Sequence, residues 1–213
     1  MSYEVDYSVI IRTLGTAGEK YANLLNSISK LDPQPKEVIV VLPEGYDLPK
    51  EQLGFEKYYF SPKGMVAQRV YGIENASTKY ALICDDDVGF DSEFVRKLYK
   101  PISEGKCSFS AGPLLSFFPP KGLKTLVSAA MGAASPTLFK KKQYVSLLRT
   151  GGYSFNRKID TKSEAYFEAL SLPWTCFFAD IEALKKIDIA SEKWLDLNGY
   201  SALDDQTMFY KGY

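Results

Sequence analysis

Histidine is absent from the 213-residue chain. This absence excludes Ser-His-Asp and Cys-His catalysis and removes imidazole as a metal ligand, so acid–base chemistry has to come from carboxylates, lysine, tyrosine or cysteine. Cysteine is scarce as well, because Cys84, Cys107 and Cys176 lie far apart and form no C-x-x-C pair. They predict neither a disulfide framework nor a zinc site, and a reducing, cytoplasmic location is the expectation that follows.

Net charge and long apolar runs are also lacking. Lys plus Arg and Asp plus Glu number 26 each, so no overall charge attracts nucleic acid or another polyanion. The start of the chain has no basic stretch leading into an apolar one, and no apolar run reaches transmembrane length. The sequence therefore predicts a globular protein that does not bind nucleic acid and has no secretion or membrane-spanning signal of its own.

What the first half does contain is an alternation of apolar strands and helices. A helix is predicted to start at a Thr16–Glu19 capping box, and a second one spans residues 65–75. Strands that are apolar on both faces and alternate with helices require a parallel sheet that is covered on both sides. The sequence thus predicts an α/β fold with a mostly parallel central sheet flanked by helices. The predicted strands span residues 7–13, 37–42, 57–60 and 80–84.

The second half is less regular, with a predicted strand over residues 172–178 and a helix over residues 180–187. No repeat or linker separates the halves, so we expect one domain over residues 1–213. We expect residues 1–100 to form its nucleotide-binding half and residues 101–213 to form the second half. Within the segment 117–142, an apolar stripe from Leu123 to Met131 fits either packing on the domain or a peripheral membrane contact.

Three consecutive aspartates, Asp85, Asp86 and Asp87, directly follow the predicted strand 80–84. Ligands of open parallel sheets bind at this carboxyl end. In an extended chain Asp85 and Asp87 project to one side, and two carboxylates ~4 Å apart repel by on the order of 4 kcal/mol, which favours a bound cation. Oxygen ligands predict Mg²⁺ or Mn²⁺, with positions left for the phosphates of a nucleotide diphosphate. A solvated acidic loop is the alternative.

With these residues the chain resembles the inverting glycosyltransferases of family 2, which have the GT-A fold. The likeness begins at residues 8–13 and includes residues 64–73, which are similar to the family's G-x-x-x-x-R-x-x-G-I helix. It implies that Asp85 and Asp87 fill the D-x-D motif, with Asp87 as the metal ligand. Asp85 then lies nearer the ribose and is a second candidate ligand of the metal. Asp86 and Arg69 are then candidate contacts of the nucleotide sugar. The alternative for Arg69 is a solvated arginine on a helix face.

Two further nucleotide contacts follow from the same resemblance. Thr13 ends the first strand at the family's nucleotide-contacting edge, although a threonine there is equally typical of a turn. Glu44 is the nearest match to an acidic pair that many members carry after the second strand. Because that pair is replaced here, the base stays open, and a UDP-sugar is the default that the resemblance implies.

A second acidic cluster, Asp204 and Asp205, resembles the family's E-D motif at a helix start. The resemblance implies that Asp205, with Asp204 beside it, is the general base that deprotonates an acceptor hydroxyl, so that the anomeric configuration inverts. Ser201 and Asp204 also form a capping pattern, so a capping role is the alternative for Asp204.

Together these features predict a metal-assisted glycosyltransferase that moves a sugar from a nucleotide-diphosphate donor to a saccharide or lipid-linked acceptor. It is expected in the cytoplasm, with peripheral contact at the inner face of the cell membrane left open. A sugar-phosphate nucleotidyltransferase and a catalytically idle nucleotide-sugar-binding module are the alternatives. The former would carry paired glycines after its first strand, where this chain has Arg-Thr-Leu-Gly-Thr at residues 12–16.

Overall fold

A computed structural model describes residues 5–112, 123, 127, 134–136, 143–147, 153–156, 165–198 and 204–212. The chain groups into two compact units, of which unit 1 contains Met1–Ala111 and Trp174–Asp204. Unit 2 contains Gly112–Pro173 and Asp205–Tyr213. The single domain expected over residues 1–213 stays a prediction.

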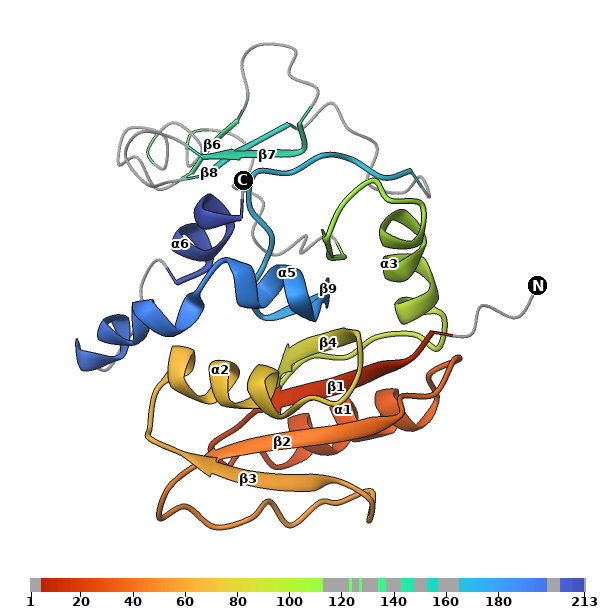
Figure 1. The fold of residues 1–213 in the computed structure, drawn as a ribbon, viewed down its shortest axis with the longest axis vertical. Helices are drawn as coiled ribbons and strands as arrows, with labels where there is room; N and C mark the ends of the chain where they lie inside the picture. Colours follow the sequence, from red (N-terminus) through yellow and green to blue (C-terminus); the bar gives the residue numbers. More distant parts are fainter. Residues whose placement is uncertain are drawn as a thin grey trace. The chain divides into compact units, whose positions relative to one another are not determined.

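Unit 1 is built on a six-stranded sheet in the order β3-β2-β1-β4-β9-β5 (Figure 1). Strands β3, β2, β1 and β4 are parallel, whereas β9 runs antiparallel to both β4 and β5. The mostly parallel α/β sheet expected from the sequence is therefore confirmed. The strands are β1 (Tyr7–Arg12), β2 (Glu37–Pro43), β3 (Lys57–Ser61), β4 (Tyr80–Asp85), β5 (Phe109–Ser110) and β9 (Cys176–Asp180).

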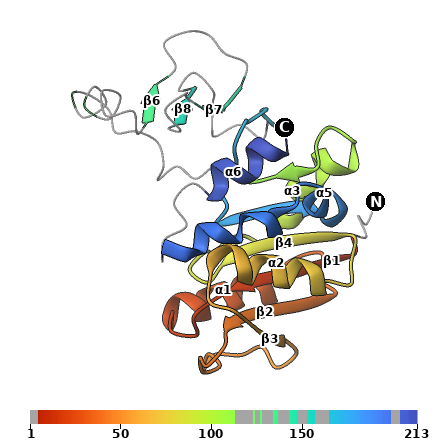
Figure 2. The same cartoon turned by 60° about the vertical axis from the view of Figure 1, so that its left-hand side comes forward.

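Helices cover both faces of this sheet (Figures 1 and 2). Helices α1 (Glu19–Ser29) and α3 (Phe94–Ser103) share a buried core with Val9 and Ile11 of β1. Ile10 alternates to the opposite face, where it lies against α2 (Met65–Asn75). Each fully buried Val, Leu or Ile side chain contributes about 1.5–3 kcal/mol, and burial on both faces matches the apolar runs within β1, β2 and β4. Helices α5 (Ile181–Lys186) and η2 (Ile189–Asn198) complete unit 1.

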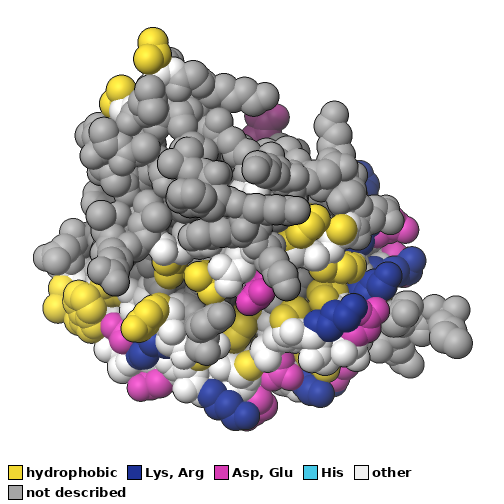
Figure 3. Space-filling view, turned by 90° about the horizontal axis from the view of Figure 1, so that it is seen from above, with side chains coloured by type: hydrophobic (Ala, Val, Ile, Leu, Met, Phe, Trp, Pro, Cys, Tyr) yellow, Lys and Arg dark blue, Asp and Glu magenta, His cyan; other side chains and the backbone are white. Residues whose placement is uncertain are grey.

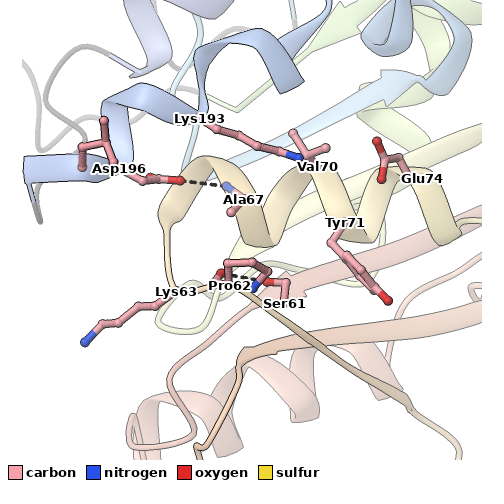
Figure 4. A pocket seen from close by; sticks show the side chains of 10 residues that line it. Ser61, Pro62, Lys63, Ala67, Val70, Tyr71, Glu74, Lys193 and Asp196 are labelled. Atoms are coloured by element: carbon pink, nitrogen blue, oxygen red, sulfur yellow. Dashed lines mark hydrogen bonds between the residues drawn. The ribbon is translucent and has the colours of Figure 1, made fainter.

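Two glycines, Gly64 and Gly72, allow neighbouring side chains to approach the backbone around helix α2 closely. The Asp196 carboxylate of η2 accepts hydrogen bonds from the backbone N–H groups of Val66 and Ala67, at 3.1 and 2.9 Å, and so caps the start of α2 (Figure 4). A Cβ on Gly64 would overlap this carboxylate, and a Cβ on Gly72 would overlap Ile10 of the sheet. Both glycines of the stretch 64–73 are therefore required by packing.

Charged side chains on the described surface pair locally. On α3, Lys97 lies 3.2 Å from Asp91 and 3.5 Å from Glu93. Figure 3 shows the same pattern, with Lys and Arg side chains interspersed with Asp and Glu. Exposed pairs of this kind contribute about 0–1 kcal/mol each, so they keep the surface solvated and add little to stability.

Unit 2 contains a three-stranded sheet in the order β6-β8-β7, with β6 and β8 parallel and β7 and β8 antiparallel. Helix α6 (Asp204–Lys211) begins at the boundary between the units. Among the described residues, none of the helices combines the length with the apolar composition that crossing a membrane would need. The strands are β6 (Ala134–Pro136), β7 (Val145–Leu147) and β8 (Tyr153–Phe155).

The apolar stripe of residues 123–131 falls largely outside the described residues. Leu123 and Val127 are both helical and both exposed. The remaining residues of the stripe lie outside the described part, so its packing or membrane contact stays a prediction.

Two local expectations differ from the structure, and one helix was not expected. Helix α1 begins at Glu19, and Gly18 stands at its N-cap with a φ of 56° and no side-chain cap, so the Thr16 capping box is wrong. The chain turns through Gly18 and starts the helix later than the box requires. The strand predicted over 172–178 is β9 at Cys176–Asp180, because residues 174–175 form a turn. Helix α3 was not predicted, and it tolerates Pro101 in its last turn, although proline ordinarily interrupts a helix.

Candidate functional site

A cavity of about 300 Å³ opens where β1 and β4 end beside the start of α1. Its volume is at the lower end of the range of ligand pockets. The cavity combines acidic and basic side chains at the carboxyl end of parallel strands, the place where ligands of open α/β sheets bind. Its lining consists of Arg12, Leu14, Thr16, Ala17, Lys20, Asp86 and Asp87.

Asp85 is the buried anchor of this edge, with 7% of the residue exposed. Its Oδ1 accepts hydrogen bonds from Arg12 Nε at 3.1 Å and from Arg69 Nη2 at 2.9 Å. Arg69 is 1% exposed, and its guanidinium carbon lies 5.0 Å from the ring centroid of Trp174. The solvated alternative for Arg69 is therefore wrong, because this side chain connects α2 to the end of β4. Its contact with a nucleotide stays a prediction.

Asp86 is fixed by Thr13, the residue that follows β1. The Thr13 hydroxyl donates to Asp86 Oδ2 at 2.6 Å and accepts the backbone N–H of Gly15 at 2.9 Å. Burial raises the pKa of Asp86, the Thr13 hydrogen bond and the Arg12 charge oppose this shift, and the neighbouring aspartates add to it. Thr13 thus joins the β1–α1 loop to the acidic triplet, and its contact with a nucleotide stays a prediction.

Asp87 is the accessible member of the triplet. Its side chain is 48% exposed, and Lys20 Nζ lies 3.4 Å from its Oδ2. The Lys20 side chain is itself 70% exposed, so this ion pair is held in water and is weak. Asp87 is therefore available to a ligand that enters the cavity.

The expected alternation, with Asp85 and Asp87 on one side, does not hold. Strand β4 ends at Asp85, and Asp86 and Asp87 begin a turn, so the two-residue period of an extended chain stops there. Asp86 and Asp87 consequently line the cavity together, while Asp85 is held between two arginines.

The predicted site residues Glu44, Asp204 and Asp205 are not among the residues that line this cavity. Glu44 directly follows β2, with an exposed side chain and a backbone N–H that donates to Ser61 O at 2.9 Å. Asp204 and Asp205 open helix α6, which confirms their position at a helix start, while their side chains lie outside the described ones. The aspartate triplet belongs to unit 1 and Asp205 to unit 2, so a pocket shared by the two clusters stays a prediction.

Sequence reasoning missed both basic residues of the cavity lining, Arg12 and Lys20. Both carry a local signal in retrospect. Arg12 is the charged residue at the carboxyl end of an otherwise apolar strand, and Lys20 is the second residue of the helix that follows. Side chains at these two positions face the same sheet edge as the triplet.

Comparison with known families connects this edge to a function. Residues 8–163 match the model of the family described as glycosyl transferase family 2. The chain belongs to glycosyl transferase family 2. The matched range contains Thr13, Arg69 and the triplet and ends before Asp204. The predicted glycosyltransferase family is therefore confirmed, while the roles of the site residues stay predictions.

Solved structures show the fold of this family 2 chain. TarS residues 1–349 from S. aureus is 20% identical with a TM-score of 0.51, covering 98% of this chain and 55% of that one. A structure of the same TarS fragment in complex with UDP-GlcNAc is 18% identical, with a TM-score of 0.51 and coverages of 98% and 53%. GalNAc-T7 with UDP, GalNAc and Mn²⁺ is 12% identical, with a TM-score of 0.63 and coverages of 100% and 41%.

This family 2 chain thus spans about half the length of the TarS structures and less of GalNAc-T7. The predicted GT-A fold is confirmed by these likenesses. A comparison with curated protein sequences found no match.

The carboxylate oxygens of the cavity lining fit the divalent cation that the family resemblance implies. Asp86 and Asp87 line the cavity side by side, and carboxylate oxygens are preferred ligands of Mg²⁺ and Mn²⁺. Within the part of the chain that the structure describes, no three or more Asp, Glu, His or Cys side chains converge as a metal site. Two carboxylates suit an ion that takes its remaining ligands from water and substrate phosphates.

Proposed function

We propose that this family 2 domain transfers a sugar from a nucleotide-diphosphate donor to a hydroxyl of a saccharide or lipid-linked acceptor, with inversion at the anomeric carbon. The observation that carries the proposal is the cavity lined by Asp86 and Asp87 at the carboxyl edge of a GT-A sheet. A UDP-sugar is the proposed donor class. It is supported by the structures of TarS with UDP-GlcNAc and of GalNAc-T7 with UDP.

On the donor side, Asp87 is the proposed principal ligand of Mg²⁺ or Mn²⁺, supported by its exposure on the cavity. Asp86 lies beside it, held in place by Thr13. Asp85, the second candidate ligand, already binds two arginines through Oδ1, so coordination by Asp85 would use its other oxygen. When bound, the ion would neutralise the charge that develops on the departing diphosphate. Arg69 and Glu44 remain proposed contacts of the nucleotide sugar.

On the acceptor side, Asp205 is the proposed general base, with Asp204 beside it at the start of α6. Its carboxylate takes the proton of the acceptor hydroxyl, and that oxygen forms a bond to the anomeric carbon. The bond from this carbon to the diphosphate oxygen breaks on the opposite face, and its electron pair leaves with the nucleotide. Because the chain has no histidine, a carboxylate is the expected base.

Calorimetric titration tests the donor side directly. Wild-type protein is titrated with UDP-GlcNAc, UDP-glucose and UDP-galactose, each with and without Mn²⁺, and Asp87→Ala is expected to abolish the Mn²⁺-dependent binding. Asp6→Ala is the matched control, because Asp6 is an exposed aspartate that pairs with Lys36 near the start of β1. Metal-dependent affinity retained by Asp87→Ala would defeat the ligand assignment.

Two other functions predict different products from the same samples. A sugar-phosphate nucleotidyltransferase releases pyrophosphate from a nucleoside triphosphate, and family 2 membership favours glycosyl transfer over this reaction. A catalytically idle module binds the donor without hydrolysis or transfer. The cytoplasmic location and the peripheral membrane contact remain predictions from the sequence.

A further inference from the structure

Lys20 lies where a bound cation and a bound diphosphate would both act on it. Its Nζ lies 3.4 Å from Asp87 Oδ2, and both side chains line the 300 Å³ cavity. The other cation in the lining, Arg12, is engaged by Asp85 at 3.0 Å. Lys20 therefore supplies the positive charge beside the proposed cation ligand.

The same contact is weakened once a divalent ion binds Asp87. An ammonium and a metal ion at the same carboxylate repel each other, so binding of the ion favours displacement of Lys20. The displaced ammonium is free to move, because its side chain is 70% exposed and its four-carbon stem is flexible. A diphosphate entering the cavity carries more negative charge than Asp87 alone and gives this ammonium a stronger partner.

We propose that Lys20 is a positioning residue that occupies the cation position at Asp87 in the donor-free protein and moves to the donor diphosphate when the ion binds. Lys20 then weakens the binding of metal alone and strengthens the binding of nucleotide in the presence of metal. With Lys20 present, binding of the ion and binding of the donor each increase the affinity for the other, so that the ion enters mainly together with the donor. This inference rests on the proposed function.

Electron paramagnetic resonance of Mn²⁺ measures the first half of the proposal without any turnover. The dissociation constant of Mn²⁺ alone is compared between wild-type protein and Lys20→Ala at low ionic strength, where surface charges are least screened. An exposed ion pair contributes roughly up to 1 kcal/mol, so Lys20→Ala is expected to bind Mn²⁺ about two- to five-fold more tightly. Calorimetry with UDP at saturating Mn²⁺ measures the second half, and the variant is expected to bind UDP about two- to five-fold more weakly.

Two further variants make the result specific. Lys36→Ala removes another exposed lysine, which pairs with Asp6 at 3.3 Å, and it should change neither constant. Lys20→Arg keeps the positive charge and should restore wild-type values. Mn²⁺ affinity of Lys20→Ala that equals the wild-type value, or UDP affinity that does not fall, overturns the proposal. Wild-type protein that binds no UDP with or without Mn²⁺ would instead overturn the proposed function.

Discussion

Replacing Arg69 by methionine removes the guanidinium from the cluster that anchors the end of β4. Methionine is unbranched and flexible, so it fills much of the same volume, and its sulfur can contact the ring of Trp174 in place of the guanidinium. The substitution therefore tests the charge and the hydrogen bond to Asp85 rather than the packing of α2. The side chain is 1% exposed, so water cannot replace the lost partner without a rearrangement.

The magnitude follows from the geometry of Asp85. Removing one partner of a buried ion pair costs about 3–5 kcal/mol, because the remaining charge is left in a poorly solvated site. Here Arg12 still reaches Asp85 Oδ1 at 3.0 Å, with a side chain that is 19% exposed, so part of the compensation survives. We expect Arg69→Met to lower the free energy of unfolding by about 3 kcal/mol, at the low end of that range.

Urea unfolding measures this loss, followed by circular dichroism and by tryptophan fluorescence, to which Trp174, buried against Phe177, and the exposed Trp194 both contribute. Coincident transitions by the two probes establish that one free energy describes the change. Arg96→Met is the matched control, since Arg96 is 41% exposed on α3 and its loss should cost less than about 1 kcal/mol. In a double-mutant cycle with Asp85→Asn, the coupling energy should reach about 2 kcal/mol. A loss below about 1 kcal/mol, or additive effects in the cycle, would refute the anchoring role.

Three other outcomes can be checked. Burial alone would raise the pKa of Glu37, but hydrogen bonds from Lys57, Ser77 and Ser8 lower it from 4.5 to about 2. Ionised Glu37 therefore stabilises the folded protein by on the order of 2–3 kcal/mol above pH 4.5, and this contribution is lost as the pH falls towards 2. The loss of unfolding free energy in Glu37→Gln relative to wild type, measured by urea unfolding, should shrink over that range. Gly64→Ala should cost about 1–3 kcal/mol by displacing Asp196 from the start of α2, whereas Gly89→Ala, whose Cβ would meet only Ser27 Oγ at 3.6 Å, should cost little in the same assay. Asp205→Asn should leave calorimetric donor binding intact and remove transfer of sugar, and an unchanged turnover number would contradict its role as the base.

Local sequence pattern determined much of the fold. The bounds of α2 were predicted to the residue, and β1, β2, β3 and β4 to within one residue, because continuous apolar runs and helical spacing are short-range signals. The position of the aspartate triplet at the carboxyl edge followed from the same strand. Family membership could be inferred as well, since the motif residues lie in these regular elements or directly beside them.

The tertiary structure alone decided how distant residues combine. Strand β9 pairs with β4 across more than 90 residues of intervening chain, with Cys84 opposite Cys176, and no local pattern encodes such a register. This pairing brings Trp174 close to Arg69 of α2, whereas the pairing of β1 with β4 places Arg12 beside Asp85. Asp85 is thus held between two arginines, and Asp86 and Asp87 line the cavity. The sequence by itself determined which carboxylates stand at the edge of the sheet. Only the packing of the chain decided which of them is buried and which is free to meet a ligand, because burial depends on neighbours that are remote in sequence.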